Sequence, residues 1–255
     1  MLGPGRVVYL GASFSAEDHA HHAVQLVVAE GAPFTWSSDG ETRTASVALI
    51  PAGVAHALDA SGTRVVVVLV ERHGADGAGL DALAVRAHRE DSGIDRSVRD
   101  AVLGETIPAA DAAAAEWLAF VDRCIVHLLG PRSREPVLSR ESRVALRSMQ
   151  RAIAEGRAPR LTEVADELSL SPTRLTHRFT REVGIPFRAL VPWLRVAAAV
   201  REMQATRARG VEGSLTRAAH AAGFSDAAHL TRTFRALFGL PPSLVLSRAR
   251  LVGFE

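Results

Sequence analysis

The chain has 255 residues, of which 47% are hydrophobic, so it can form one large domain or two ordinary ones with sizeable cores. A single cysteine, Cys124, excludes an internal disulfide framework, and no basic start followed by an apolar run resembles a signal peptide, so we expect a cytoplasmic protein. Its 30 basic residues, all arginine, nearly balance 28 acidic residues, but residues 1–130 hold 9 arginines against 17 acids and residues 131–255 hold 21 against 11. An acidic half joined to a basic half indicates that one module binds nucleic acid and that the other has a different role.

The first half of the chain is typical of β structure. Glycine, proline, aspartate and serine separate its short apolar runs at close intervals, which predicts an antiparallel barrel or sandwich. The predicted strands are Val7–Leu10, Ala23–Ala29, Phe34–Trp36, Ser46–Ile50 and Arg64–Val70. The longest apolar stretch, Val65–Val70, is far too short to span a membrane, so no membrane partner is expected.

A helix is predicted next, after a mixed segment of short helices and loops over residues 71–112. It begins with Asp111 as its cap and runs to Leu129 with an apolar stripe of Trp117, Val121, Cys124, Ile125 and Leu128. We interpret this stripe as a homodimer interface; the alternative is that it covers the β domain of a monomer. Gly130–Pro136 is the predicted linker between a domain of residues 1–130 and a domain of residues 131–255, and a helix over Ser139–Glu155 follows it.

Two helix-turn-helix patterns then occur in tandem, joined by a long helix predicted over Phe187–Arg207. Each has a short helix, a tight turn and an arginine-bearing second helix that ends at glycine. Alanine stands where the helices cross, and two apolar residues four apart line the inner face of the second helix, which leaves its outer face free for a major groove. The first copy is Leu161–Leu168, Ser169–Pro172 and Thr173–Gly184, with Ala165, Leu175 and Phe179; the second is Leu215–Ala222, Gly223–Asp226 and Ala227–Gly239, with Ala219, Leu230 and Phe234.

Residues 160–243 resemble the DNA-binding domain of the AraC/XylS family of transcription regulators. The matching residues are Ser171-Pro172, Phe179, Gly184, Arg195, Gly223-Phe-Ser-Asp226, Phe234-Arg-Ala-Leu-Phe-Gly239 and Pro242. The resemblance implies that the two second helices enter successive major grooves of double-stranded DNA. The base-reading positions would be Thr173, Thr176, His177, Ala227, Ala228, His229 and Arg232, and the phosphate contacts Arg174, Arg178, Arg181 and Arg235.

Two departures from the family pattern affect this interpretation. Ala227 and Ala228 stand where relatives often have polar side chains, so the second copy would read thymine methyl groups or little sequence. The segment Gln204–Ser214 is a few residues longer than usual, which puts the relative placement of the two copies in doubt.

Family members often carry a cupin-like barrel before this domain, and the β-rich half resembles one. The fold class implied is therefore α+β, with a cupin-like antiparallel barrel, flanking helices and an all-α C-terminal domain. His19-Ala-His21 and Pro51-Ala-Gly53-Val-Ala-His56 match the positions at which metal-binding cupins have ligands, with Gln25 where glutamate is common and His22 as an alternative to His21. Three imidazoles suit Zn, Ni, Cu, Fe or Mn. The alternative is a barrel that binds an organic ligand or nothing.

The function that these patterns favour is an effector-controlled, sequence-specific DNA-binding regulator without enzymatic activity, acting as a homodimer. The alternative is a cupin-type metalloenzyme, an oxygenase or isomerase, fused to a DNA-binding domain; no acidic residue of the first motif stands out as its base. An RNA-binding module is disfavoured because the chain lacks interleaved aromatics and has one tyrosine. An activator also needs a surface for RNA polymerase, and no sequence feature identifies one.

Overall fold

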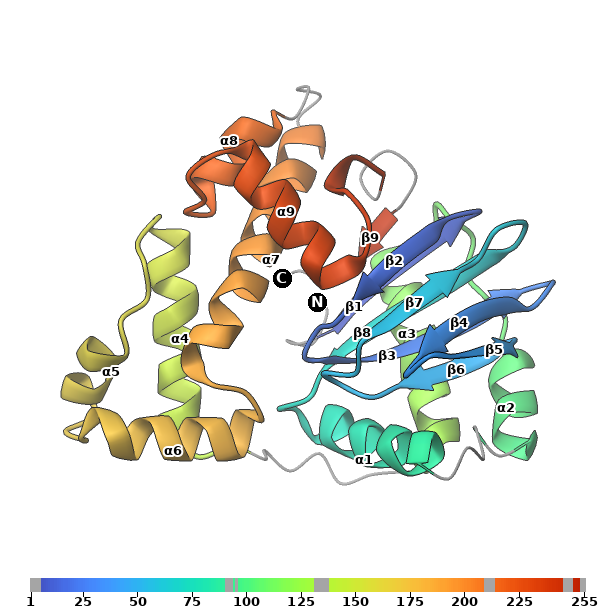
Figure 1. Cartoon of the computed structure of the whole chain (residues 1–255), viewed down its shortest axis with the longest axis horizontal. Helices are drawn as coiled ribbons and strands as arrows, with labels where there is room; N and C mark the ends of the chain where they lie inside the picture. Colours follow the sequence, from blue (N-terminus) through green and yellow to red (C-terminus); the bar gives the residue numbers. More distant parts are fainter. Residues whose placement is uncertain are drawn as a thin grey trace. The chain divides into compact units, whose positions relative to one another are not determined.

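The computed structural model describes residues 6–89, 94, 96–130, 138–208, 214–244 and 250–252 (Figure 1). The chain is divided into two compact units. The first comprises Met1–Glu135 with Arg235–Glu255, and the second comprises Pro136–Phe234. The division near residue 135 lies close to the predicted domain boundary at residue 130. The C-terminal segment differs from the prediction, because it groups with the first unit, where its strand pairs with the first strand of the chain.

The first unit contains two antiparallel sheets (Figure 1). One has the strand order β6-β3-β8-β1-β9 and the other the order β2-β7-β4-β5. The strands are β1 (Arg6–Ala12), β2 (Ser15–His19), β3 (Ala23–Glu30), β4 (Phe34–Ser38), β5 (Glu41–Ala45), β6 (Val47–Ile50), β7 (His56–Asp59), β8 (Arg64–Glu71) and β9 (Arg250–Val252). The two sheets do not close into one hydrogen-bonded barrel among the described residues, so the predicted barrel is replaced by two open sheets.

Three helices cover one face of the five-stranded sheet: α1 (Ala75–Arg89), α2 (Arg96–Leu103) and α3 (Ala114–Leu129). The even-numbered residues of β3, such as Val24 and Leu26, pack in one core with Leu80 of α1 and Trp117 of α3. Because successive side chains of a strand alternate between faces, the odd-numbered residues of β3 point away from these helices. Both faces of β3 are nevertheless buried from Ala23 to Ala29, which is why its sequence is an unbroken apolar run apart from Gln25.

The apolar stripe of α3 lies in this core. All five of its residues are buried, and they pack together with the five-stranded sheet: Trp117, Val121, Cys124, Ile125 and Leu128. The stripe therefore packs against the β domain, which was the alternative interpretation, and it is not available as a dimer interface. The cap is corrected as well, because α3 begins after Ala113, whose N–H donates to Glu116 Oε1 at 2.9 Å, and not at Asp111.

The second unit is helical. Its elements are α4 (Arg140–Ala154), α5 (Leu161–Glu167), α6 (Pro172–Val183), α7 (Phe187–Ala208), α8 (Leu215–Ala221) and α9 (Ala227–Phe238), of which α9 crosses into the first unit at Arg235. Ser139 caps α4 by accepting from the N–H of Ser142, and its own hydroxyl donates to Glu182 Oε2 of α6 at 2.7 Å. The start of α4 is thus attached to the end of α6.

The predicted helices agree with these bounds to within a few residues, since each carries a strong periodic apolar pattern. The predicted linker beyond Gly130 and residues 209–213 of the long segment Gln204–Ser214 lie outside the described residues. No single helix of the described ranges is long and apolar enough to cross a membrane, although α6 and α7, bent by 60°, pass that test as a pair.

Candidate functional site

The first helix-turn-helix motif consists of α5, the turn at Leu168–Ser171, and α6. Ser171 caps α6 by accepting from the N–H of Arg174 at 3.3 Å, and Pro172 occupies the first helical position, where its missing N–H costs nothing. The inner face of α6 is buried through Leu175, Phe179 and Val183. Gly184 ends the helix at φ 86°, a conformation that favours glycine.

The second motif repeats this arrangement with α8, the turn Gly223–Asp226, and α9. Asp226 caps α9 by accepting from the N–H of His229 at 2.6 Å, and this hydrogen bond holds the pKa of the Asp226 carboxyl below its usual value. Gly223 turns the chain at φ 77°. Leu230 and Phe234 are buried on the inner face of α9, and Ala219 is buried where the two helices meet. The predicted inner residues of both copies are therefore confirmed.

The structure places most of the predicted DNA-contacting side chains on the outer faces of the two helices. Seven are exposed: Thr173, Arg174, His177, Arg181, Ala228, Arg232 and Arg235; the other four, Thr176, Arg178, Ala227 and His229, are half-buried. The hydroxyl of Thr176 donates to the carbonyl of Pro172 at 2.8 Å, so its methyl group is the part left for a base edge. Arg232, the candidate for bidentate contact with guanine, is among the exposed residues.

Arg178 and His229 make close contacts within the protein. Arg178 Nη1 lies 2.5 Å from Glu141 Oε1 of α4, an ion pair that the linear sequence did not reveal. His229 Nδ1 lies 3.1 Å from Ser225 Oγ, and its ring packs edge-on against Phe224. These contacts hold Arg178 and His229 against the helical unit. Arg174, Arg181 and Arg232 are exposed, although Arg181 Nη2 also lies 3.8 Å from Glu182 Oε1.

The second candidate site is a cluster of three buried histidines in the first unit. His19 ends β2, His21 follows it, and His56 begins β7 directly opposite His19 in the strand pair. One ligand nitrogen from each ring lies within 4.8 Å of the other two. Within the described ranges this is the one group of three or more such side chains whose ligand atoms come together.

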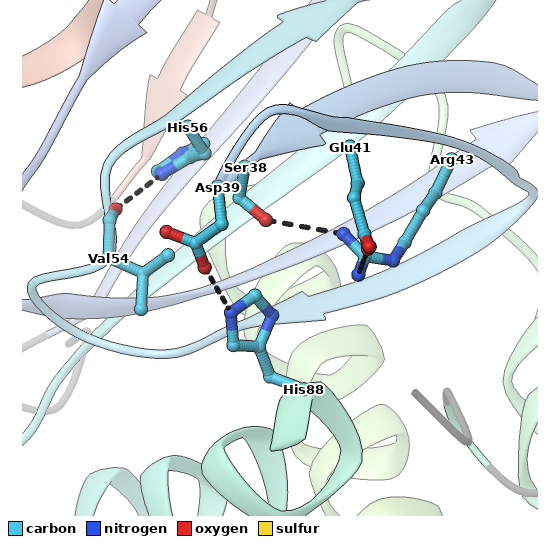
Figure 2. A network of polar contacts seen from close by, with 7 residues as sticks. All are labelled: Ser38, Asp39, Glu41, Arg43, Val54, His56 and His88. Carbon is cyan, nitrogen blue, oxygen red and sulfur yellow. Dashed lines mark hydrogen bonds and ion pairs between the residues drawn. The ribbon is translucent and has the colours of Figure 1, made fainter. Parts of the chain in front are cut away.

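The turn Pro51–Gly53 explains why the spacing to His56 matters. Gly53 adopts φ 82°, which favours glycine, and its N–H donates to the carbonyl of His21 at 2.7 Å. The carbonyl of Val54, the next residue, lies 2.9 Å from His56 Nδ1 (Figure 2). One short turn therefore positions two of the histidines relative to each other.

The backbone fixes the tautomer of the rings. His19 Nδ1 lies 2.8 Å from the carbonyl of Glu17 and His56 Nδ1 lies 2.9 Å from that of Val54. Because a carbonyl only accepts, both Nδ1 atoms carry the hydrogen and both Nε2 atoms carry the lone pair. His56 Nε2 is buried without a hydrogen-bond partner.

Each ring nitrogen of His21 lies close to an oxygen atom. Its Nδ1 lies 2.9 Å from the carbonyl of Ala23 and its Nε2 lies 3.0 Å from Gln25 Oε1. A neutral imidazole has one N–H and donates to only one of these oxygens. Gln25 is on the face of β3 that points away from the helices, and its amide lies beside His21.

Burial determines the charge state of the cluster. It lowers the pKa of His19 and, together with the neighbouring imidazoles, lowers that of His21 to about 3 and that of His56 to about 4. The three rings are thus neutral near pH 7, the state in which imidazole binds metals. His22 lies apart from this cluster, with Glu71 and His73 as its neighbours, so of the two alternatives it is His21 that belongs to the cluster.

The C-terminal part of the first unit packs beside His19. The N–H of Glu17 donates to the carbonyl of Gly239 at 3.0 Å, and a Cβ at Gly239 would lie 2.8 Å from His19 Nδ1. The ring of Phe238 lies 6.4 Å from that of His21. This contact was not foreseen from the sequence, where the terminal glycine of α9 was interpreted only as the end of a helix.

A two-sheet unit and a helical unit with two helix-turn-helix motifs define a two-domain α+β protein. The family model described as a helix-turn-helix domain matches residues 164–248, which include both candidate DNA-reading helices, so the C-terminal half carries a helix-turn-helix domain. A search of the curated proteins found no match.

Solved structures of ToxT from Vibrio cholerae share the fold over nearly the whole chain. ToxT with a bound unsaturated fatty acid has a TM-score of 0.55 and 14% sequence identity, covering 97% of each chain. ToxT bound to (E)-4-(8-methylnaphthalen-1-yl)but-3-enoic acid has a TM-score of 0.51 and 12% identity, covering 95% of this chain and 98% of ToxT. The likeness includes the first unit, and the cupin assignment of that unit stays a prediction.

Proposed function

We propose that this protein is a sequence-specific DNA-binding transcription regulator controlled by an effector that binds in its first unit. The observation that carries the proposal is the pair of motifs with buried inner faces and exposed, arginine-bearing outer faces on α6 and α9. Helices of this kind enter major grooves, where arginine pairs with guanine and with phosphates.

The experiment that tests DNA binding starts from a random duplex library, because the operator is not known. Duplexes selected on the full chain are measured by fluorescence anisotropy over a range of salt concentrations. We expect affinity to fall steeply with salt, by about 0.9 logarithmic units per phosphate contact for each tenfold rise in salt, because arginine–phosphate contacts release counterions. Enrichment of no sequence, or an affinity that salt does not change, would contradict the proposal.

Arginines of the two outer faces provide the matched test. Arg174→Ala and Arg181→Ala remove exposed charges from α6, whereas Arg99→Ala removes a half-buried arginine that pairs with Asp100 in the first unit. We expect both α6 variants to weaken binding and the Arg99 variant to leave it unchanged.

Control by an effector is supported by the ToxT structures, since two of them hold a carboxylic acid and share this fold across both domains. An unsaturated fatty acid is therefore one probe to titrate into the complex with the selected duplex. A change in DNA affinity at saturating ligand supports effector control by an organic acid; an unchanged affinity excludes that ligand class. The predicted homodimer is tested on the same sample by light scattering after size-exclusion chromatography.

A further inference from the structure

We propose that His19, His21 and His56 bind one divalent transition-metal ion through their Nε2 atoms, with Zn²⁺ as the probe that tests it. The metal site would be the place where an effector acts, so its influence on DNA binding rests on the proposed function. Metal binding itself does not depend on that function. Three independent features of the cluster support the assignment: the ligand type, the orientation of each ring and the unpartnered nitrogen at its centre.

The ligand set suits such an ion chemically. Imidazole nitrogen is a common ligand of Zn²⁺, Ni²⁺ and Cu²⁺, and three protein ligands with one open position are typical of sites at which a further molecule binds. The described residues give the cluster no carboxylate ligand, and Asp18, the nearest charged neighbour of His19 and His56, is exposed. An all-nitrogen set of this kind disfavours Ca²⁺ and Mg²⁺, which prefer oxygen.

The orientation of the rings is already that of a metal site. Metal-binding histidines generally donate their second N–H to a backbone carbonyl or a carboxylate, which fixes the tautomer. The carbonyls of Glu17, Ala23 and Val54 each lie 2.8–2.9 Å from the Nδ1 atom of one of the three rings. The rings themselves converge from two elements and a connecting loop, with centroid separations of 4.2 Å between His19 and His56 and 5.4 Å between His21 and His56.

One ligand nitrogen of the cluster, Nε2 of His56, is buried without a hydrogen-bond partner. His56 is 1% exposed, and its Nε2 has no hydrogen-bond partner, which costs folding free energy unless something binds there. An anion would be a poor occupant, because the rings are neutral and His19 and His56 present lone pairs rather than N–H groups at Nε2. A cation that accepts these lone pairs would give the buried nitrogen of His56 a partner.

Binding requires a small adjustment. Zn²⁺ with bonds of about 2.0–2.1 Å holds tetrahedral nitrogens about 3.4 Å apart, so the ligand atoms, now within 4.8 Å of one another, must approach by at most about 1.4 Å. His21 must also release Gln25 from its Nε2 atom. The freed amide oxygen of Gln25 is then available at the fourth position.

The test titrates ZnCl₂ into the full chain after chelation and dialysis, followed by calorimetry, with Co²⁺ absorption as a second readout of the ligand geometry. His56→Gln and His19→Gln each remove one ligand, and circular dichroism checks that each variant folds. His127→Gln is the matched control, because it removes an exposed histidine of α3 that pairs with Glu105.

We expect one Zn²⁺ per chain, a loss of affinity on the order of 100-fold or more in either ligand variant, and no change in the control. Two results would overturn the proposal: a wild-type chain that binds no stoichiometric Zn²⁺, or variants that lose affinity no more than the control does. DNA binding is measured on the same samples with and without Zn²⁺. Absent DNA binding with an intact metal site contradicts the proposed function alone, and the converse contradicts the metal site alone.

Discussion

The N–H of Gly53 donates a 2.7 Å hydrogen bond to the carbonyl of His21, and it does so from a backbone conformation, φ 82°, that favours glycine. This bond joins the loop after β2 to the turn before β7. The two segments carry the histidines of the cluster, so the position of His56 relative to His21 depends on a residue that contributes no side chain.

We therefore expect Gly53→Ala to weaken Zn²⁺ binding. A Cβ at this position would meet nothing within 4 Å, so the cost is backbone strain of about 1–2 kcal/mol rather than a clash. Relief of that strain would shift the turn and separate the rings. Calorimetric titration of the variant beside Gly62→Ala, a matched turn glycine at φ 84° that also has open space, measures the effect; equal losses in both would show that Gly53 has no special role.

Gln25→Glu is expected to destabilise the metal-free protein and to strengthen Zn²⁺ binding. A carboxylate among three neutral buried rings lacks a charged partner, so the melting temperature of the metal-free chain should fall. With Zn²⁺ present the added charge strengthens the site, and the affinity should rise by about 10-fold or more. Thermal melts with and without Zn²⁺ measure both effects. A variant that loses stability in both conditions would place Gln25 outside the coordination of the ion.

Arg232→Ala should relax sequence specificity rather than weaken binding uniformly. A bidentate contact between arginine and guanine contributes about 1–3 kcal/mol of discrimination, and its loss should appear at one base pair of the selected duplex. Arg235→Ala, by contrast, should weaken all sequences equally and reduce the salt slope by about 1. Competition binding with single-base variants of the duplex distinguishes the two. If both variants behave alike, Arg232 is a phosphate contact.

Ser139→Ala should destabilise the helical unit by about 1–2 kcal/mol, because it removes both the cap of α4 and a hydrogen bond to a charged group on α6. Chemical denaturation of the full chain measures this loss. Ser171→Ala, which removes only a helix cap, is the control and should cost about 1 kcal/mol or less.

The same contact predicts a pH dependence. Partial burial raises the pKa of Glu182, but the hydrogen bonds from Ser139 outweigh it and hold this pKa below its usual value. A lowered carboxyl pKa in the folded state stabilises the protein above the ordinary glutamate pKa, about 4.5, and this stabilisation is lost as the pH falls through the folded value. Stability curves between pH 6 and about pH 3 should therefore be less steep for Ser139→Ala than for the wild type; parallel curves would contradict the assignment.

The sequence allowed the helices and the helix-turn-helix motifs to be predicted because their signals are local. Buried pairs such as Leu175 and Phe179 lie four residues apart, and serine caps stand directly before their helices. The strands of the five-stranded sheet were also found where they are continuous apolar runs. Strands β2, β5, β7 and the three-residue β9 were missed. The polar residues of β2, β5 and β7 give no apolar pattern; in β5, Glu41–Ala45, no residue is buried.

The sequence identified the residues of the candidate sites by type, but it did not indicate the hydrogen bonds and ion pairs that hold them in place. His19, His21 and His56 were singled out by the resemblance to the cupin motifs, but the carbonyls that orient them belong to residues of any type, which leave no mark in a sequence. The ion pair of Arg178 with Glu141 joins two helices far apart in the chain, so the linear order gave no sign that this arginine was occupied. The apolar stripe of α3 shows a further limit: periodicity identified its buried face but not the surface that covers it.

The attachment of Ser139 to Glu182 also has a mechanical consequence. The polypeptide enters the helical unit just before α4, and the first residue that it meets is bonded to the C-terminal turn of a candidate DNA-reading helix. A tension applied to Ser139 would therefore load α6 together with α4. The candidate DNA-reading helix is connected to the start of the helical unit through two hydrogen bonds as well as through the covalent chain.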